Sequence, residues 1–198
     1  MTYAIIGSGA IGSALARQFA RKEIPVSIAN SRGPASIVPL ADELGASIAP
    51  CSLNGALDAD VIILAVPFTS VPEAVKSQTD WAGKIVVDAT NAIDFSDYSP
   101  ADLGGRLSSD IVAEAVPGAT LVKAFNTLPA AVLARDPVSA DGARVLFVSG
   151  NDASANTVVA ELAARLGFAP ITLGALSGGG LLQQYGGALM AHSLIKQR

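Results

Sequence analysis

Short apolar runs alternate along the chain with segments of helical periodicity. The clearest run is Asp60–Val66 (DVIILAV), whose nearly continuous apolar character is typical of a strand buried on both faces of a parallel sheet. In the first helical segment Ile11, Leu15 and Phe19 recur every fourth residue, as one face of an α-helix requires. The runs that fit strands are Tyr3–Ile6, Pro25–Asn30, Ala46–Pro50, Asp60–Val66, Lys84–Thr90, Thr120–Phe125, Arg144–Gly150 and Ala169–Gly174.

Helices are expected between these strands. After the first helical segment they cover Ile37–Leu44, Val71–Ser77, Ser108–Val116, Pro129–Ala134 and Ala153–Leu166, the last with Asp152 as its N-cap. This alternation predicts an α/β fold, a Rossmann-like doubly wound and mostly parallel sheet of about eight strands.

The sequence predicts one Rossmann-like domain over residues 1–174 and a small helical extension over residues 175–198. We expect the extension to be a glycine-rich turn followed by an apolar helix over Leu181–Ile195. Its apolar face needs a covering surface, either on the same domain or on a dimer partner.

Composition and charge narrow the classes of partner that we expect for this protein. The 198 residues are 51% hydrophobic and 15% charged, which favours a packed core over disorder. No apolar stretch approaches the roughly 20 residues that cross a bilayer, and no basic region precedes the first apolar run. We therefore expect a cytoplasmic protein without a membrane partner. Net charge is −4, and no Lys/Arg cluster exceeds Arg21–Lys22, so nucleic acid is not an expected partner.

A glycine pattern, Gly7-x-Gly9-x-x-Gly12, follows the first strand directly and opens the first helix. In dinucleotide-binding folds the first glycine allows the tight turn, the second lets a pyrophosphate approach the backbone, and the third lets helix and strand pack closely. The phosphates then lie at the helix N-terminus, where free N–H groups favour negative charge. The alternative is a glycine turn without a ligand.

The stretch IANSRGP follows the second strand, where an acidic residue would bind the ribose 2′-hydroxyl of NAD. Here the polar residues are Asn30, Ser31 and Arg32, and none is acidic. An arginine offers a planar fork of donors suited to the 2′-phosphate of NADP, and a charged hydrogen bond contributes about 1.5–3 kcal/mol. The stretch therefore predicts NADP rather than NAD; the alternative is a solvated loop arginine.

Three later turns lie at the ends of predicted strands, where open α/β sheets bind ligands. Ala65, Val66 and Pro67 end the fourth strand and are candidates to contact the ribose or nicotinamide. Asn91 and Asn126, with Thr127, follow later strands and are candidates for the nicotinamide amide or the substrate. Each of these residues also fits an ordinary role as a turn or capping residue.

A catalytic residue is not evident. The single histidine, His192, and the single cysteine exclude a histidine–cysteine metal cluster. No Tyr-x-x-x-Lys pair is present, and Lys123 with Asn126 is spaced like a pair found in hydroxyacid dehydrogenases. Those enzymes carry a long helical second domain that this chain lacks room for. We therefore expect Lys123 to be a surface lysine at a strand end, with proton donation as the alternative.

Seven blocks occur in the order seen in one family: YAIIGSGAIG, IANSRGP, VILAVP, VVDATN, VKAFNT, VSGND and LGALSGGGLL. Through them the chain resembles the NADPH-dependent coenzyme F420 reductases and their bacterial relatives. The resemblance implies a homodimer that binds NADP and passes a hydride between nicotinamide and a deazaflavin. It places diphosphate contacts on Ser8, Gly9, Ala10 and Ile11, and the nicotinamide near Val66, Pro67 and the AFNT loop. It also assigns 2′-phosphate contacts to Ser31 and Arg32.

The acceptor side departs from the archaeal members, which read LHT where this chain has Phe125, Asn126 and Thr127. The second substrate is therefore open: F420, FMN, a quinone, an imine or another small oxidant. Two alternatives to a deazaflavin or flavin reductase stay open as well. One is a small imine or hydroxyacid reductase that uses Lys123, and the other is a sensor that binds NADP without turnover.

Overall fold

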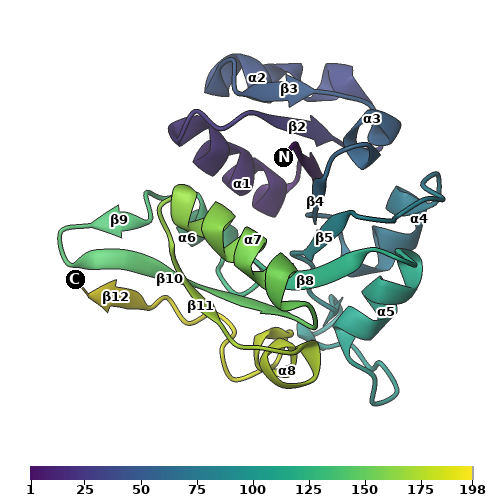
Figure 1. Cartoon of the computed structure of the whole chain (residues 1–198), viewed down its shortest axis with the longest axis vertical. Coiled ribbons are helices and arrows are strands. Elements are labelled where there is room, and N and C mark those ends of the chain that lie inside the picture. The colour runs from purple at the N-terminus through teal and green to yellow at the C-terminus, as the bar shows by residue number, and fades with distance from the viewer. Residues whose placement is uncertain (198) are drawn as a thin grey trace.

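The computed structural model of the protein describes residues 1–197 and places eight strands side by side in the order β11-β10-β8-β5-β4-β1-β2-β3 (Figure 1). Two further strands, β9 and β12, pair with the first part of β10. The strands of this sheet are β1 (Tyr3–Ile6), β2 (Val26–Ala29), β3 (Ile48–Pro50), β4 (Val61–Leu64), β5 (Ile85–Asp88), β8 (Thr120–Ala124), β9 (Val138–Ser139), β10 (Gly142–Gly150), β11 (Ala169–Thr172) and β12 (Ile195–Gln197).

Six strands, from β3 to β8 along the sheet, run parallel, so their carboxyl ends share one edge. The ladder continues past the strands into the turns: the amide of Gly7 donates to Ala29 (2.8 Å), and that of Ala65 donates to Ile6 (2.8 Å). β10 runs antiparallel to β8, and β11 runs parallel to β10. The order of the parallel part is that of a Rossmann sheet, which the pattern of apolar runs predicts correctly.

Helices cover both faces of this sheet (Figure 1). They are α1 (Ala10–Arg21), α2 (Val38–Leu44), α3 (Leu53–Leu57), α4 (Val71–Val75), α5 (Ser108–Ala115), α6 (Ala130–Leu133), α7 (Ala153–Arg165) and the single turn α8 (Leu181–Gln183). α1, α6 and α7 pack on one face, and α3, α4 and α5 pack on the other. None of the helices in residues 1–197 is long and apolar enough to cross a membrane.

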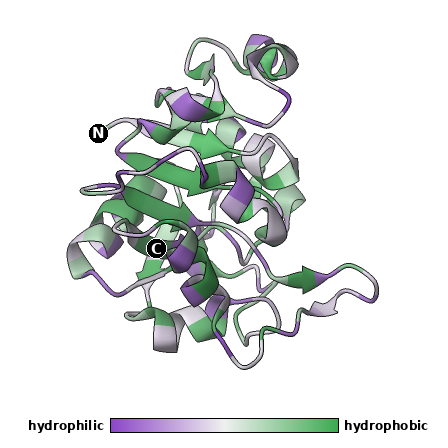
Figure 2. Cartoon of the chain, turned by 90° about the vertical axis from the view of Figure 1, so that its right-hand side faces the viewer, coloured by the Kyte–Doolittle hydropathy of each residue, from purple (hydrophilic) through white to green (hydrophobic). Residues whose placement is uncertain are grey.

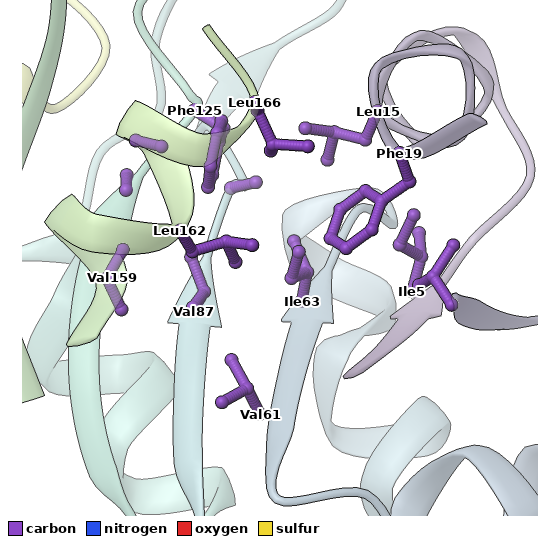
Figure 3. Close-up of a cluster of buried hydrophobic side chains, with 14 of the residues drawn as sticks. Ile5, Leu15, Phe19, Val61, Ile63, Val87, Phe125, Val159, Leu162 and Leu166 are labelled. Atoms are coloured by element: carbon purple, nitrogen blue, oxygen red, sulfur yellow. The ribbon is translucent and has the colours of Figure 1, made fainter. Parts of the chain in front are cut away.

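Strand residues alternate between two apolar clusters, one on each face. Ile5 and Ile63 point toward Leu15 and Phe19 of α1 and toward α7 (Figure 3), whereas Ile6 joins the opposite cluster. Figure 2 shows hydrophobic residues concentrated in the central strands and hydrophilic ones mostly in helices and loops. Burying a side chain such as Phe19, which is fully buried, stabilises the fold by about 1.5–3 kcal/mol.

The eight predicted strands are all present, and their ends lie within two residues of the predicted ones. The helices between them are confirmed to similar accuracy, and Asp152 caps α7 by accepting a hydrogen bond from the amide of Ala155 (2.7 Å). The structure adds elements that no pattern indicated. These are α3, β9, and a two-stranded hairpin of β6 (Ile93–Asp94) and β7 (Ser99–Pro100).

The predicted helix over Leu181–Ile195 is wrong. Only α8 is helical, following a π-helical turn at Leu176–Gly180, and the chain then turns and ends in β12. Gly186 adopts φ +85° and lies so close to Pro100 that a Cβ would meet its ring at 2.5 Å. The apolar spacing is helical, but a glycine pair at this point favours a turn. The final residues instead pair antiparallel with β10.

Candidate functional site

A cleft of about 830 Å³ lies at the shared carboxyl edge of the parallel strands. Its walls come from the turn after β1 (residues 6–9), the turn after β2 (residues 30–32) and the turn after β4 (residues 65–67), with α3 and α4 at one side. Its volume falls within the range of about 300–1,000 Å³ that small-molecule sites occupy. This edge is where open α/β sheets bind their ligands.

The three glycines of the first turn each have a distinct geometry. Gly7 adopts φ +112°, and a Cβ there would lie 2.2 Å from the carbonyl oxygen of Ala65. A Cβ on Gly12 would lie 1.8 Å from the carbonyl oxygen of Gly7, so helix and strand approach as closely as glycine allows. Gly9 faces open space, with no atom within 4 Å of an added Cβ. The turn therefore leaves room for a ligand directly at the N-terminus of α1.

The side chain of Asn30 connects the first two turns. Its amide nitrogen donates to the hydroxyl oxygens of Ser8 (2.7 Å) and Ser36 (2.9 Å). Its Oδ1 accepts from the backbone amide of Arg32 (2.8 Å) and from the Ser36 hydroxyl (3.1 Å). Both ends of the amide are therefore used within the protein. Asn30 fixes the loop that carries Arg32 against the glycine turn.

Ser31 and Arg32 are exposed and line the cleft. Among the ion pairs formed within residues 1–197, none involves the Arg32 guanidinium. A second cation that the motifs did not indicate, Lys76, also lines the cleft and is paired with Glu73 (2.5 Å). The sequence could have indicated Lys76, because the helix that carries the preceding residues, α4, begins shortly after the turn that follows β4. The cleft thus carries two cations at its surface.

Behind the next strand ends lies a buried ion pair. Lys123 Nζ is 2.7 Å from Asp88 Oδ2, and both side chains are fully buried. The other oxygen of Asp88 accepts from the amide (2.9 Å) and the hydroxyl (2.6 Å) of Thr90. The expectation that Lys123 is a surface lysine is therefore wrong. The register of β5 and β8 places Lys123 opposite Asp88, so the ammonium group has a carboxylate partner inside the sheet.

Asn91 and Asn126 meet at the ends of the same two strands. Asn91 donates to the carbonyl oxygen of Asn126 (2.9 Å), and the Asn126 amide donates to Asn91 Oδ1 (3.0 Å) and to the carbonyl of Gln183 (2.7 Å). Neither asparagine lines the cleft, and Asn126 is 1% exposed. The structure therefore brings these two candidates together, but outside the lining of the cleft.

Of the other candidates, Gly7, Ser8, Gly9, Ala65 and Pro67 line the cleft, whereas Ala10, Ile11 and Gly12 lie in the first turn of α1 without lining it. The first-turn N–H groups of a helix have no partner within the helix, so they are available to an anion at this end. The site therefore offers unpaired backbone donors beside an exposed arginine.

No group of three or more His, Cys, Asp or Glu side chains that could hold a metal ion occurs in the described part of the chain. The single cysteine, Cys51, is half-buried near the end of β2, and its Sγ lies 3.6 Å from the carbonyl of Ile28. Burial raises the pKa of the Cys51 thiol, so the thiolate form is disfavoured at neutral pH.

Comparison with known proteins adds a family to this geometry. Residues 2–92 match the family model described as NADP oxidoreductase, coenzyme F420-dependent. The crystal structure of a hypothetical protein from Sinorhizobium meliloti is 59% identical, covers 100% of this chain and 96% of its own, and superposes with a TM-score of 0.97. A protein from Arthrobacter sp., provisionally named an F420-dependent NADP reductase, is 28% identical over 89% of this chain and 86% of its own, with a TM-score of 0.72.

Among curated proteins, metalloreductase STEAP3 of Rattus norvegicus is 32% identical over 96 residues. The match covers 48% of this chain and 18% of STEAP3, so this chain corresponds to less than a fifth of that longer protein. Structures of a reductive aminase from Aspergillus terreus, 22% identical with a TM-score of 0.62, share the fold. The resemblance drawn from the seven sequence blocks and the Rossmann-like fold are thus confirmed.

Proposed function

We propose that the chain is a member of the family whose model, described as NADP oxidoreductase coenzyme F420-dependent, matches residues 2–92, and that it transfers a hydride between NADPH and a deazaflavin or flavin-like acceptor. The observation that carries this proposal is the combination, in one cleft, of open space at Gly9 with an exposed Arg32 free of any acidic partner in the described residues. Open space suits a diphosphate, and an unpaired arginine suits a further phosphate.

In this proposal the residues of the cleft hold NADP in a defined order. The backbone amides of Ala10 and Ile11 bind the diphosphate beside Ser8 and Gly9, where a side chain would block its approach. Ser31 and Arg32 bind the 2′-phosphate, and Asn30 keeps their loop in place. Ala65, Val66 and Pro67 form the wall along the ribose next to the nicotinamide, and Asn91 follows β5, the strand beside β4. When bound, NADPH supplies the hydride.

The acceptor side favours a ring system over a substrate that needs a proton donor. Lys123, the one candidate donor, is fully buried and paired with Asp88, so it does not face the cleft. A flavin-like ring delocalises the incoming electrons, and its reduction depends mainly on the proximity and orientation of the two rings. The buried pair therefore weighs against an imine or hydroxyacid reductase that uses Lys123.

We also propose a cytoplasmic homodimer, as the family resemblance implies. Apolar side chains are exposed along the C-terminal segment, among them Leu181 (47%), Leu182 (42%) and Leu194 (45%). A second copy would remove this surface from water. Light scattering coupled to gel filtration should return twice the mass of one chain, and a monomer at micromolar concentration would contradict this part of the proposal.

The function is tested by following the absorbance of reduced nicotinamide in the presence of a panel of acceptors. F420, FMN, FAD, a quinone and a cyclic imine are offered separately with NADPH and then with NADH. We expect turnover with F420 or a flavin, faster with NADPH, and no oxidation without an acceptor. NADPH binding without turnover on any acceptor would contradict the enzyme and favour an NADP sensor. Turnover on the imine alone would favour the reductase alternative.

A further inference from the structure

The exposed aromatic side chains of the protein lie together on one hairpin. The chain has six phenylalanines, three tyrosines and one tryptophan. Among those in residues 1–197, only Phe95 (65%) and Tyr98 (69%) are exposed, and both lie between β6 and β7. Their rings meet edge to face, with centroids 6.1 Å apart and an interplanar angle of 82°. Aromatic residues are enriched in the buried centres of protein interfaces, so this pair marks a candidate docking surface.

The hairpin of residues 93–100, which we call the arm, holds the pair in a fixed position. Tyr98 has a φ of +60°, a left-handed conformation that costs a residue with a side chain about 1–2 kcal/mol. Two hydrogen bonds keep it there: the amide of Ser99 donates to Asp97 Oδ1 (2.8 Å), and the Tyr185 hydroxyl donates to the Tyr98 carbonyl oxygen (3.0 Å). An arm that is already ordered gives up little conformational freedom when it binds a partner.

A small pocket of about 240 Å³ lies at the base of the arm. Its volume is below the range of about 300–1,000 Å³ that small-molecule sites occupy, so the pocket suits a side chain better than a nucleotide. Neither Phe95 nor Tyr98 lines it, although Pro100 of the arm does. The arm therefore forms one wall of this pocket without filling it. The apolar part of the lining is Ala92, Pro100, Ala101, Leu103 and Tyr185.

The arm and the small pocket together form a surface that can pair with itself. A twofold dimer uses the same patch on both subunits, so the arm of each copy meets the pocket of the other. Such a contact closes on itself and leaves neither arm nor pocket free for a third copy. The small pocket shares no lining residue with the cofactor cleft, so an arm seated in it does not occupy the cleft.

The area of this contact is close to what a stable dimer needs. An aromatic side chain buries about 150–250 Å². Burying the exposed parts of Phe95 and Tyr98 in both copies, with the surfaces that face them, removes roughly 1,000 Å² from water. Leu181 and Leu182, exposed by 47% and 42%, precede the pocket residue Gln184 and extend the apolar surface. The total then approaches the 1,200–2,000 Å² that is typical of specific interfaces, roughly as ranges of this kind are counted.

We propose that the partner of this surface is a second copy of the chain, with Phe95 and Tyr98 of each copy seated in the small pocket of the other. This inference rests on the homodimer included in the proposed function, and it names the surface through which that dimer forms. It does not depend on which acceptor receives the hydride.

The first test removes both rings and measures the mass in solution. Light scattering coupled to gel filtration should return two chains for the wild type at micromolar concentration and one chain for the double variant Phe95→Ser with Tyr98→Ser. The dissociation constant of the dimer should rise by roughly 100-fold or more, because buried aromatic side chains carry much of the binding energy of an interface. Both rings are exposed in the single chain, so the variant should fold as the wild type does.

Val38→Ser is the matched control. Val38 is an apolar residue of α2 that is 44% exposed and lines neither the small pocket nor the cleft. This variant loses exposed apolar surface away from the arm, and it should keep the mass of two chains.

A second test asks for the contact itself. Tyr98→Cys and Leu103→Cys are made in separate chains, each with Cys51→Ala so that no other thiol is present. The two are mixed, allowed to exchange subunits and treated with a mild oxidant. Because the two thiols lie on different chains, a disulfide between them reports an arm in the pocket of another copy. The mixture should yield more disulfide-linked dimer than either variant alone.

Four results would overturn the inference. A wild-type dimer that persists in the double variant, or a mixture with no more linked dimer than its components, would place the interface elsewhere. Equal dissociation of Val38→Ser would mean that the effect does not depend on place. A double variant that stays dimeric but loses turnover with F420 or FMN would assign the two rings to the acceptor. A monomeric wild type would overturn the inference together with the proposed homodimer, whereas turnover of NADPH tests the hydride transfer separately.

Discussion

The two halves of the carboxyl edge differ in how they use their polar groups. On one half, the turns after β1, β2 and β4 leave Arg32 and the backbone at Gly9 open in a cleft. On the other half, the turns after β5 and β8 pair nearly all theirs with one another, and Asn126 is buried beneath Gln183. The open half indicates its ligand by the groups it leaves free. Within the closed half, Asn126 Oδ1 is a buried side-chain oxygen without a hydrogen-bond partner among the described residues.

The largest expected effect comes from breaking the closed half. Lys123→Met leaves the Asp88 carboxylate buried without its cation, and we expect the free energy of unfolding to fall by about 3–5 kcal/mol. Urea unfolding measures this loss. The double variant Asp88→Asn with Lys123→Met removes both charges and keeps an acceptor for Thr90, so it should recover much of the stability. A single variant as stable as the wild type would contradict the structural role of the pair.

Two glycines of the open half should respond in opposite ways. In Gly12→Ala the new Cβ meets the Gly7 carbonyl oxygen at 1.8 Å, so helix and strand must separate, at a cost of about 3 kcal/mol in stability. In Gly9→Ala the Cβ enters open space, so stability should change by no more than about 0.5 kcal/mol. The affinity for NADPH should nevertheless fall about tenfold in Gly9→Ala, because the methyl group takes the place of the diphosphate. Thermal unfolding and calorimetry separate the two outcomes.

Removal of the Arg32 guanidinium tests whether the open half prefers NADPH to NADH. Arg32→Ala should weaken NADPH binding by roughly 10- to 100-fold and leave NADH binding unchanged, because only NADPH carries the 2′-phosphate. Arg17→Ala is a suitable control, since Arg17 is paired with Glu43 through two hydrogen bonds outside the cleft. Equal affinity of the wild type for both cofactors would refute the phosphate assignment.

The smallest effect is expected at Lys76. Its side chain is 67% exposed and already paired with Glu73, so Lys76→Ala should reduce NADPH affinity by no more than about fivefold, as exposed ion pairs contribute about 1 kcal/mol or less. The effect should shrink further at high salt. A loss as large as that of Arg32→Ala would mean that the two cations bind the phosphate together.

The open half was predictable from the sequence because its determinants are local. The glycine turn depends on conformations within six residues, and Ser31 and Arg32 follow a strand that the apolar pattern locates correctly. The assignment of these residues as NADP contacts stays a prediction until a complex is examined. Asn30 was predicted as a contact, and the structure shows that its amide is occupied by Ser8, Ser36 and Arg32.

The closed half was not predictable, because it depends on pairings that no local pattern records. Lys123 meets Asp88 only through the register of two strands 35 residues apart. Asn126 is covered by Gln183, 57 residues further along the chain, and by the turn that replaces the expected C-terminal helix. The spacing of leucines and alanines favours a helix there, but Gly186 adopts φ +85°, which lies outside the helical region.

The return of the C-terminal segment over Asn126 has a consequence for the order of biosynthesis. A ribosome makes the turns after β1, β2 and β4 within the first 67 residues, whereas Gln183 and Ala191, which bind Asn126 and Thr127, emerge more than a hundred residues later. Domains generally fold as units during synthesis. The turns that line the cleft are thus synthesised long before the residues that contact Asn126 and Thr127, and the domain can close over these two residues only after Ala191 has emerged.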